Sequence, residues 1–339
     1  MAPQPEPDCR RRPLGSNWHR ELADALRDPE ALIDRLDLPE NWREPARRAA
    51  KLFPLLVTES YLRRIEPGNP HDPLLRQVLP LDAEFHQPPG FTADAVGDHH
   101  AQLAPGLLKK YAGRALLIAT GACAIHCRYC FRRHFPYGEA PRRLDEWEPA
   151  LEALRRDESI QEILLSGGDP LMLTDQRLQT LLSRLSEIPH LVRLRIHSRL
   201  PIVLPSRITS EFLELITSQR LTPMMVVHAN HPRELDESCR AALRRLVCAG
   251  VPVLNQAVLL RGVNDEITVL RELCDGLVNL GVMPYYLHQL DRVQGAAHFE
   301  VDEESGRTLI AELRRQLPGY AVPEYVRETV GAAHKLPIR

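Results

Sequence analysis

Three cysteines stand close together in the sequence, at Cys123, Cys127 and Cys130. Thiols at this spacing bind soft metal centres, and a cubane iron–sulfur cluster normally takes four of them, so three would leave one iron open to a substrate. A structural zinc site is the alternative, but such sites are closed by four ligands, usually given as two spaced pairs. The remaining cysteines lie singly along the chain. The spacing therefore favours an iron–sulfur cluster with an open coordination position.

A second group that could do chemistry is the run Gly167-Gly168-Asp169-Pro170. Taken alone, this run is typical of a plain turn. Glycine also allows a ligand to come close to the backbone. Beside a cluster that binds a substrate, we interpret the run as a ligand-binding loop.

Short apolar runs alternate with amphipathic stretches of helical length from residue 114 onward, a pattern typical of βα units around a parallel sheet. The sequence predicts six strands, at 115–120, 160–166, 192–197, 222–227, 252–259 and 283–287. In parallel α/β folds, ligands bind at the carboxyl ends of the strands. We therefore expect one mouth to collect the three cysteines, Gly167-Gly168-Asp169, His197-Ser198-Arg199, His228, Asn255-Gln256 and the residues from His288 to Asp291.

The composition is that of an ordinary globular protein of 339 residues, 44% of them hydrophobic, with a formal net charge of -2 that argues against nucleic acid as a partner. No apolar run approaches the roughly 20 residues of a membrane span, and the N-terminus lacks the apolar run of a signal peptide, so the cytoplasm is the expected location. Proline and amphipathic stretches dominate the first 95 residues. We predict a helical N-terminal region over 1–95, a barrel over 96–322 and a C-terminal tail over 323–339.

The segment Cys127-Arg-Tyr129-Cys130-Phe resembles the motif of the radical S-adenosylmethionine superfamily, in which an aromatic residue precedes the last cysteine. The resemblance implies an α/β fold, an incomplete (β/α)6 barrel of the TIM-like type. It also implies a 4Fe–4S cluster on the three cysteines, whose open iron binds S-adenosyl-L-methionine and cleaves it reductively to an adenosyl radical. By the same resemblance, S-adenosylmethionine would contact Gly167, Gly168, Asp169, His228 and Tyr129.

A longer resemblance, over 79–335, is to the lysine 2,3-aminomutases. It is carried by Arg114-Ala-Leu-Leu-Ile-Ala-Thr, Cys127-Arg-Tyr-Cys-Phe-Arg-Arg-His134, Leu165-Ser-Gly-Gly-Asp-Pro-Leu171, His228-Ala-Asn-His-Pro232, Asn255-Gln-Ala-Val-Leu-Leu-Arg-Gly-Val-Asn-Asp265, Pro284-Tyr-Tyr-Leu-His-Gln-Leu-Asp291 and Lys335. The family is a group of isomerases that join the radical to pyridoxal 5′-phosphate and move the α-amino group of lysine to Cβ. The resemblance therefore implies an enzyme that converts L-lysine to β-lysine.

The resemblance assigns the covalent attachment of pyridoxal phosphate to Lys335, one of only four lysines among 43 basic residues. Lys51 falls in an expected surface helix, and Lys109 and Lys110 form a pair that we place outside the strand ends. Without the resemblance, Lys335 would be read as part of a frayed cationic tail.

Arg114 matches the family's phosphate-binding arginine, with Asn255 and Gln256 as further cofactor contacts; a strand-end cation is the alternative for Arg114. Arg132 corresponds to the arginine that binds the α-carboxylate of the substrate, and the alternative is a solvated basic pair. The distal ammonium would be bound by Asp291 and by Glu328, which replaces an aspartate of the family.

Two departures indicate a branch of the family. Glu266 stands where the free-lysine enzymes carry a zinc-binding cysteine, and the chain ends four residues after Lys335. Both features resemble the short bacterial aminomutase that supplies (R)-β-lysine for modification of elongation factor P. The resemblance implies functional links to elongation factor P and its lysyl ligase and an external electron donor such as flavodoxin or ferredoxin. It leaves a homodimer open.

Two alternatives remain open. Within the class, the chain could be a free-lysine 2,3-aminomutase that makes (S)-β-lysine for catabolism or osmolyte synthesis. In another class, it could be a non-enzymatic iron–sulfur redox sensor, which would not need Lys335, Asp291 or the Gly-Gly-Asp loop.

Overall fold

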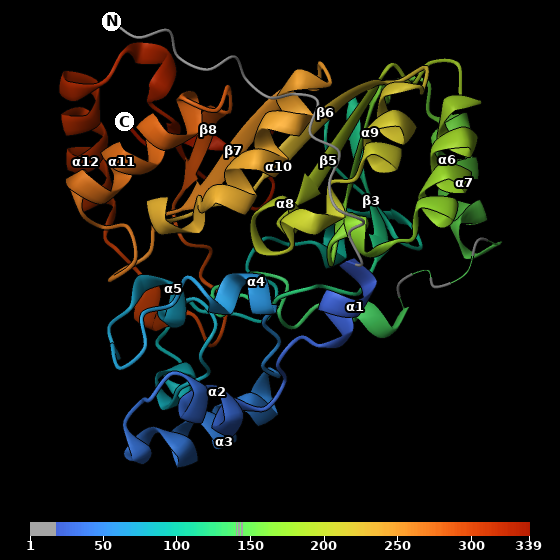
Figure 1. Cartoon of the computed structure of the whole chain (residues 1–339). Helices are drawn as coiled ribbons and strands as arrows, with labels where there is room; N and C mark the ends of the chain where they lie inside the picture. Colours follow the sequence, from blue (N-terminus) through green and yellow to red (C-terminus); the bar gives the residue numbers. More distant parts are fainter. Residues whose placement is uncertain (1–17, 140, 142, 144) are drawn as a thin grey trace, which may run out of the picture.

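The computed structural model describes residues 18–139, 141, 143 and 145–339. The first part of the predicted N-terminal region, with Cys9, lies outside the described residues. Ten strands form one sheet whose spatial order follows the chain (Figure 1). They are β1 (Gln102–Ala104), β2 (Leu107–Tyr111), β3 (Arg114–Thr120), β4 (Glu162–Gly167), β5 (Arg193–Ser198), β6 (Thr222–Val227), β7 (Val253–Val258), β8 (Met283–His288), β9 (Glu324–Arg327) and β10 (Leu336–Pro337).

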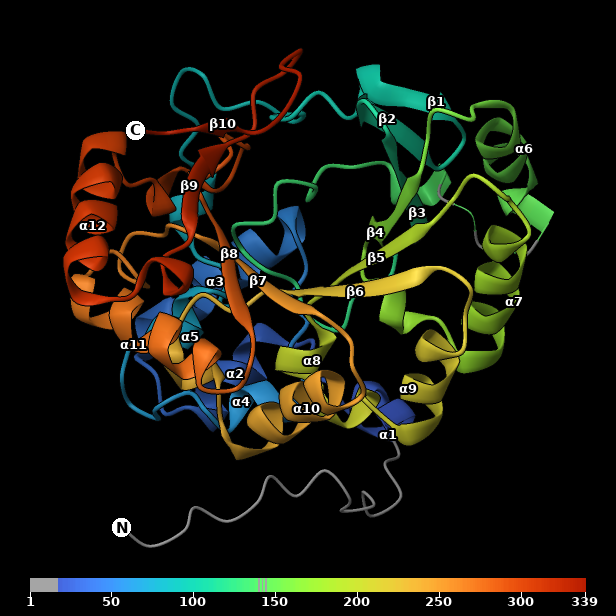
Figure 2. The ribbon, with the colours of Figure 1, turned by 90° about the horizontal axis from the view of Figure 1, so that it is seen from above.

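The strands from β3 to β9 pair in parallel, whereas β1, β2 and β10 pair antiparallel at the two edges. Seen from above, β3 to β8 curve around an axis with helices outside them (Figure 2). In the described part of the chain no ladder joins the first strand to the last, so the barrel is open. The predicted TIM-like partial barrel is confirmed, and the six predicted strands correspond to β3 to β8.

The helices outside the sheet are α6 (Glu148–Arg156), α7 (Asp175–Ser186), α9 (Ser210–Thr217), α10 (Glu237–Cys248), α11 (Ile267–Val278) and α12 (Glu303–Gln316). Helix α7 illustrates why these segments are helical. Its buried leucines Leu178, Leu181, Leu182 and Leu185 recur at the spacing of one helix face, and Thr174 caps its first turn by accepting a hydrogen bond from the backbone of Arg177.

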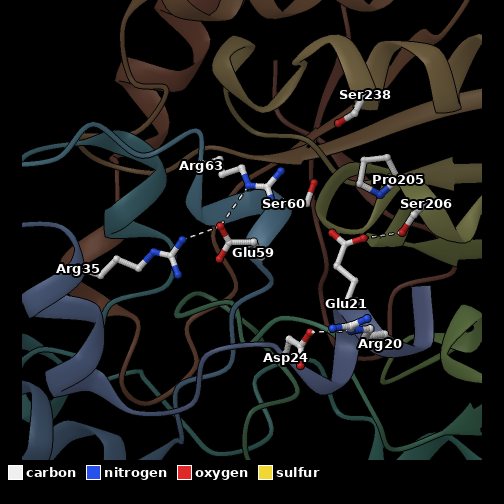
Figure 3. A pocket seen from close by; sticks show the side chains of 10 residues that line it. All are labelled: Arg20, Glu21, Asp24, Arg35, Glu59, Ser60, Arg63, Pro205, Ser206 and Ser238. Carbon is white, nitrogen blue, oxygen red and sulfur yellow. Dashed lines mark hydrogen bonds and ion pairs between the residues drawn. The ribbon is translucent and has the colours of Figure 1, made fainter. Parts of the chain in front are cut away.

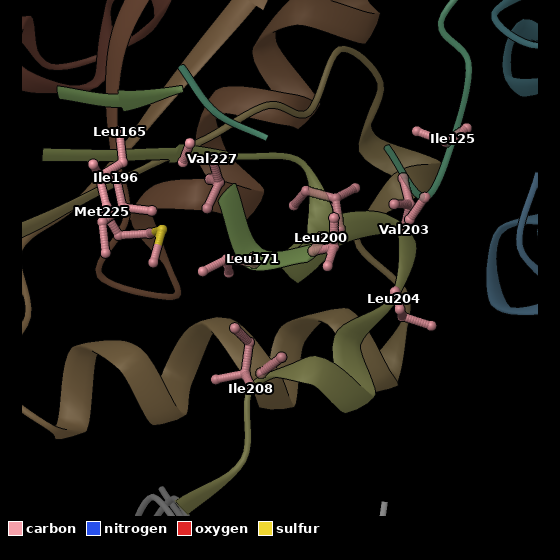
Figure 4. Close-up of a cluster of buried hydrophobic side chains, with 14 of the residues drawn as sticks. Ile125, Leu165, Leu171, Ile196, Leu200, Val203, Leu204, Ile208, Met225 and Val227 are labelled. Atoms are coloured by element: carbon pink, nitrogen blue, oxygen red, sulfur yellow. The ribbon is translucent and has the colours of Figure 1, made fainter. Parts of the chain in front are cut away.

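A layer of apolar side chains fixes the segment that follows β5. Leu165, Ile196 and Met225 are register partners on β4, β5 and β6 and form one row (Figure 4). The short helix α8 (Leu200–Val203) and the residues after it contribute the buried side chains Leu200, Val203, Leu204 and Ile208. This packing holds the carboxyl end of β5 in a single position.

The N-terminal region forms a layer of short helices that lies below the barrel in Figure 1. They are α1 (Trp18–Ala23), α2 (Pro29–Arg35), α3 (Arg43–Leu52), α4 (Glu59–Leu62) and α5 (Pro73–Arg76). The layer contacts the cysteine loop directly, since His126 N donates to Leu56 O at 2.9 Å and Arg128 N donates to Gln77 O at 2.9 Å. Among the described residues, no helix is both long and apolar enough to cross a membrane.

The last residues of the chain belong to the sheet. Residues 323–339, predicted as a tail, contribute β9 and β10, and Leu336 pairs with Arg327 across that hairpin. Lys335 is therefore held at the start of a strand. The division of the chain at 95/96 and at 322/323 stays a prediction.

Candidate active site

The three cysteines lie on the loop that follows β3, and a buried arginine fixes this loop. Arg128, between Cys127 and Cys130, donates to both carboxylate oxygens of Glu84, at 2.8 and 2.6 Å, and both side chains are inaccessible to solvent. A two-point arginine–carboxylate pair fixes orientation as well as distance. Glu84 belongs to the N-terminal region, which therefore holds the loop that carries Cys123 and its two partners.

Burial raises the pKa of the Cys130 thiol to about 11 and raises that of Cys123 well above its usual range, with the neighbouring cysteines adding to both shifts. Thiols that oppose one another's ionisation in this way need a positive centre to become thiolates. Within the described residues no set of His, Cys, Asp or Glu surrounds a single metal ion. In a cubane cluster each cysteine binds a different iron, so its ligands need not converge on one point. The donor set fits such a cluster.

The Gly-Gly-Asp loop after β4 lies against the cysteine loop. Gly168 N donates to Thr120 O at 2.8 Å, and Asp169 N donates to Ala122 O at 2.7 Å. A Cβ on Gly168 would stand 2.3 Å from Ala122 O, and Gly167 has a φ of +115°. Glycine is therefore required at both positions, because the two loops share this space.

Replacing Gly168 by alanine is expected to push the two loops apart and to cost roughly 2 kcal/mol of unfolding free energy, as overpacked sites do. Urea unfolding of the apoprotein and iron content after reconstitution would measure both effects. Gly319→Ala is the matched control, because a Cβ there meets nothing within 4 Å. A Gly168→Ala protein as stable and as rich in iron as the control would contradict this account.

Asp169 has protein partners on both carboxylate oxygens. Ser198 Oγ donates to it at 2.7 Å, and the backbone nitrogens of Arg199 and Leu171 donate at 2.7 and 3.0 Å. Burial raises its pKa to about 6, against the effect of these hydrogen bonds. The side chain thus ties β4 to the end of β5, and its contact with S-adenosylmethionine stays a prediction.

Tyr129 and His228 lie near the same loop. The Tyr129 hydroxyl accepts a hydrogen bond from Asn230 Nδ2 at 2.7 Å, which joins the cysteine motif to the loop after β6. Burial lowers the pKa of His228 to about 4, so its imidazole is neutral at pH 7. A neutral imidazole can accept as well as donate a hydrogen bond.

Asn255 and Gln256 occupy successive positions in β7 and therefore face opposite ways. The buried Asn255 amide exchanges hydrogen bonds with the backbone of Ala229, at 2.9 and 3.1 Å, so it holds the loop after β6 in place. Gln256 is half-buried. A cofactor contact of either residue stays a prediction.

A second polar group gathers where the two edges of the open barrel approach each other (Figure 2). Lys335 Nζ donates to Glu328 Oε2 at 2.7 Å, and the Tyr111 hydroxyl of β2 donates to Glu328 Oε1 at 2.6 Å. The Arg114 guanidinium stacks 4.8 Å from the centre of the Tyr111 ring. The structure therefore brings together three predicted site residues from opposite edges of the sheet.

Lys110 belongs to this group, and its predicted place outside the site was wrong. Its Nζ lies 2.7 Å from Asp98 Oδ1 and 3.6 Å from Glu328 Oε1. Lys109, its neighbour in β2, points the other way and pairs with Asp157. The reason is the alternation of side chains along a strand, which the sequence could not reveal while β2 was unrecognised.

Arg132 links the two groups. Its Nε donates to Asp98 Oδ2 at 2.7 Å and its Nη1 to Ser166 Oγ at 3.3 Å. Burial works to raise the pKa of Asp98, but Arg132 and Lys110 hold it below its ordinary value. Alternating charges thus run from Arg132 through Asp98 and Lys110 to Glu328.

Asp291 follows β8 and lies close enough to Lys335 and Glu328 to respond to their charges. Burial raises its pKa to about 7; Lys335 acts to lower it and Glu328 to raise it. His197 Nε2 and His288 Nε2 are buried near the same lysine and have no hydrogen-bond partner among the described residues. Buried polar atoms without partners mark the place where a polar ligand fits. These surroundings fit pyridoxal phosphate on Lys335.

Sequence reasoning missed the residues that position the predicted ones. The main examples are Glu84, Asp98, Lys110, Arg128, Arg199 and Glu234. Only Arg128 carried a local signal, because it lies between two cluster cysteines.

A separate hollow lies between α1, α4 and the segment after α8 (Figure 3). Its charged groups are paired with one another. Arg35 and Arg63 both donate to Glu59, at 2.6 and 3.1 Å, and Ser206 Oγ donates to Glu21 at 2.7 Å. None of the predicted site residues lines it.

Comparison with known proteins agrees with this geometry. A family model of the radical SAM superfamily matches residues 117–274. The chain is 46% identical to L-lysine 2,3-aminomutase of Haemophilus influenzae over 94% of either chain, and 47% identical to that of Escherichia coli over 96% of this chain and 95% of that one. It is 34% identical to the enzyme of Clostridium subterminale, covering 95% of this chain and 78% of that one. The chain therefore belongs to the lysine 2,3-aminomutase family of the radical SAM superfamily, and is of its short bacterial type.

Proposed function

We propose that this chain is an isomerase that converts L-α-lysine to β-lysine. The proposal rests on the meeting of Lys335, Glu328 and Asp291 with Arg132 beside the cysteine loop, in a chain that is similar over nearly its whole length to L-lysine 2,3-aminomutases. Charges of both signs are available there for an amino acid with a cationic side chain.

The cofactors of this family are a 4Fe–4S cluster, S-adenosyl-L-methionine and pyridoxal 5′-phosphate. When bound, they supply the radical chemistry that moves an amino group between adjacent carbons. Cys123, Cys127 and Cys130 would bind the cluster. Lys335 would hold pyridoxal phosphate, and Arg114 its phosphate group.

The protein's own residues bind and orient the substrate. Arg132, fixed by Asp98, presents a planar guanidinium that suits the substrate α-carboxylate. Glu328 binds the Lys335 ammonium in this structure, so it can bind another primary ammonium once Lys335 is attached to the cofactor. Asp291 supplies the second carboxylate. Fixing both ends of lysine orients Cα and Cβ between them.

Substrate binding should depend on the ionisation of Asp291. A protonated carboxyl cannot pair with the substrate ammonium, so kcat/KM for lysine is expected to fall about tenfold per pH unit as the pH drops below about 7. Glu328, whose pKa Lys335 and Tyr111 hold below its ordinary value despite burial, stays ionised over this range. The measurement is kcat/KM from roughly pH 5.5 to pH 8. Asp291→Asn should lower kcat/KM and flatten the profile; an unchanged slope in that variant would exclude Asp291 as its source.

The finer assignment is to the branch that makes (R)-β-lysine for modification of elongation factor P. It is supported by Glu266 at the family's zinc-cysteine position and by higher identity to the relatives of similar length than to the longer clostridial enzyme. A flavodoxin or ferredoxin would supply the electron, and the lysyl ligase of elongation factor P would consume the product.

Anaerobically reconstituted protein with pyridoxal phosphate, S-adenosylmethionine and a strong reductant should convert L-lysine to β-lysine. Absence of product from protein with an intact cluster would refute the proposal. Chiral chromatography of the product then decides the branch, since an (S) product would favour the free-lysine alternative. Metal analysis should find iron without stoichiometric zinc.

A further inference from the structure

A buried arginine at the end of β5 contacts a cysteine of the cluster motif. Arg199 Nη1 donates to Cys127 Sγ at 2.7 Å, and its other terminal nitrogen, Nη2, donates to Gln77 Oε1 at 2.7 Å and to Glu234 Oε2 at 3.0 Å. Only 6% of the Arg199 surface is exposed. The roles proposed above for substrate and cofactors do not use this cation.

The position of Arg199 is fixed from several sides. Its backbone nitrogen donates to Asp169 Oδ2, and its guanidinium stacks 5.5 Å from the Tyr61 ring and 5.6 Å from the Tyr129 ring. The residues that follow it pack in the apolar layer of Figure 4. A charge held this rigidly in a dry place acts strongly on its neighbours, because little water screens it.

Glu234 balances Arg199 on the side away from the thiol. Its Oε1 accepts hydrogen bonds from Gln77 Nε2 at 3.1 Å and from the backbone nitrogens of Asn230 and His231 at 3.0 and 3.1 Å. The carboxylate is therefore fixed as firmly as the guanidinium. The pair presents its positive end to Cys127.

We propose that Arg199 is a positioning residue that raises the reduction potential of the cluster bound through Cys127. Reduction transfers one electron from the external one-electron donor to the cluster, with no bond broken and no proton taken up, so the cluster and its thiolates become more negative by one charge. A fixed guanidinium that donates to a thiolate stabilises the more negative state. The inference rests on the cluster of the proposed function and not on the choice of substrate.

The test is a potentiometric titration of the reconstituted holoprotein, followed by the electron paramagnetic resonance signal of the reduced cluster. In Arg199→Met the reduced fraction at a fixed solution potential should fall about tenfold, which corresponds to a midpoint about 59 mV more negative. In Glu234→Gln, where Arg199 keeps its charge and loses its counter-ion, the midpoint should move the opposite way.

The opposite signs keep the proposal falsifiable if Arg199→Met fails to fold, because Glu234→Gln alone then decides it. Arg195→Met is the matched control. It breaks another arginine–glutamate pair, Arg195 Nε to Glu162 Oε1 at 2.7 Å, four residues earlier on the same strand. Its midpoint should stay near that of the wild type.

Unchanged midpoints in both test variants, or shifts of the same sign, would overturn the proposal, as would an equal shift in Arg195→Met. Iron content of every sample identifies protein that carries the cluster. Turnover of lysine is not needed for the measurement, so failure of the lysine assignment and failure of this inference are separate results.

Discussion

Replacing Lys335 by alanine is expected to abolish β-lysine formation, by at least about a thousandfold, because the amine that attaches the cofactor is lost. The near-ultraviolet and visible band of protein-bound pyridoxal phosphate should disappear, while the absorbance of the iron–sulfur cluster stays. The other lysines do not offer a substitute. Lys51 is exposed on α3, and Lys109 and Lys110 are both held in ion pairs.

Lys109→Ala is the matched control for this prediction. It removes an ammonium from β2, but from the face that pairs with Asp157 outside the site. That variant should retain the pyridoxal phosphate band and at least most of the activity. If the band survives in Lys335→Ala, the attachment lysine has been assigned wrongly.

The fold could be predicted where the signal is local. Each strand from β3 to β8 is a nearly continuous apolar run followed by a helix-length segment, and such runs are recognised without knowing their neighbours. The edge strands gave no such signal. β1, β9 and β10 are short, and β2 contains Lys109 and Lys110 side by side; these strands form because a partner edge supplies their hydrogen bonds.

The site divides in the same way. The cysteine spacing is local, so the sequence alone predicts a cluster. The residues that position it come from far along the chain. Arg199 is 72 positions from Cys127, and Asp98 is 34 positions from Arg132. Contacts of this kind depend on the packing of the barrel, and one sequence contains no pattern that pairs them.

Lys110 shows how such an error propagates. With β2 unrecognised, Lys109 and Lys110 could only be treated as equivalent. The strand separates them, placing one beside Asp157 and the other between Asp98 and Glu328. Lys110 thereby helps to keep two carboxylates ionised inside the site, and those carboxylates hold Arg132 and Lys335 in place.

Replacing Cys127 by alanine is expected to have the complementary effect to the loss of Lys335. Two cysteines cannot retain a 4Fe–4S cluster firmly, so the visible absorbance of the cluster, reductive cleavage of S-adenosylmethionine and β-lysine formation should all be lost. The band of bound pyridoxal phosphate should remain, because Lys335 and Glu328 belong to a different part of the sheet.

The matched control is Cys274→Ala, which removes a buried free thiol from α11, away from the cysteine loop. It should cost about 1 kcal/mol of stability and leave both chromophores in place. The two alanine variants then separate the halves of the site, one without its cluster and one without its pyridoxal phosphate. If Cys127→Ala kept a full complement of iron and cleaved S-adenosylmethionine, the three-cysteine cluster would be refuted. If it lost both chromophores at once, while Cys274→Ala kept them, the two halves of the site would depend on each other for folding.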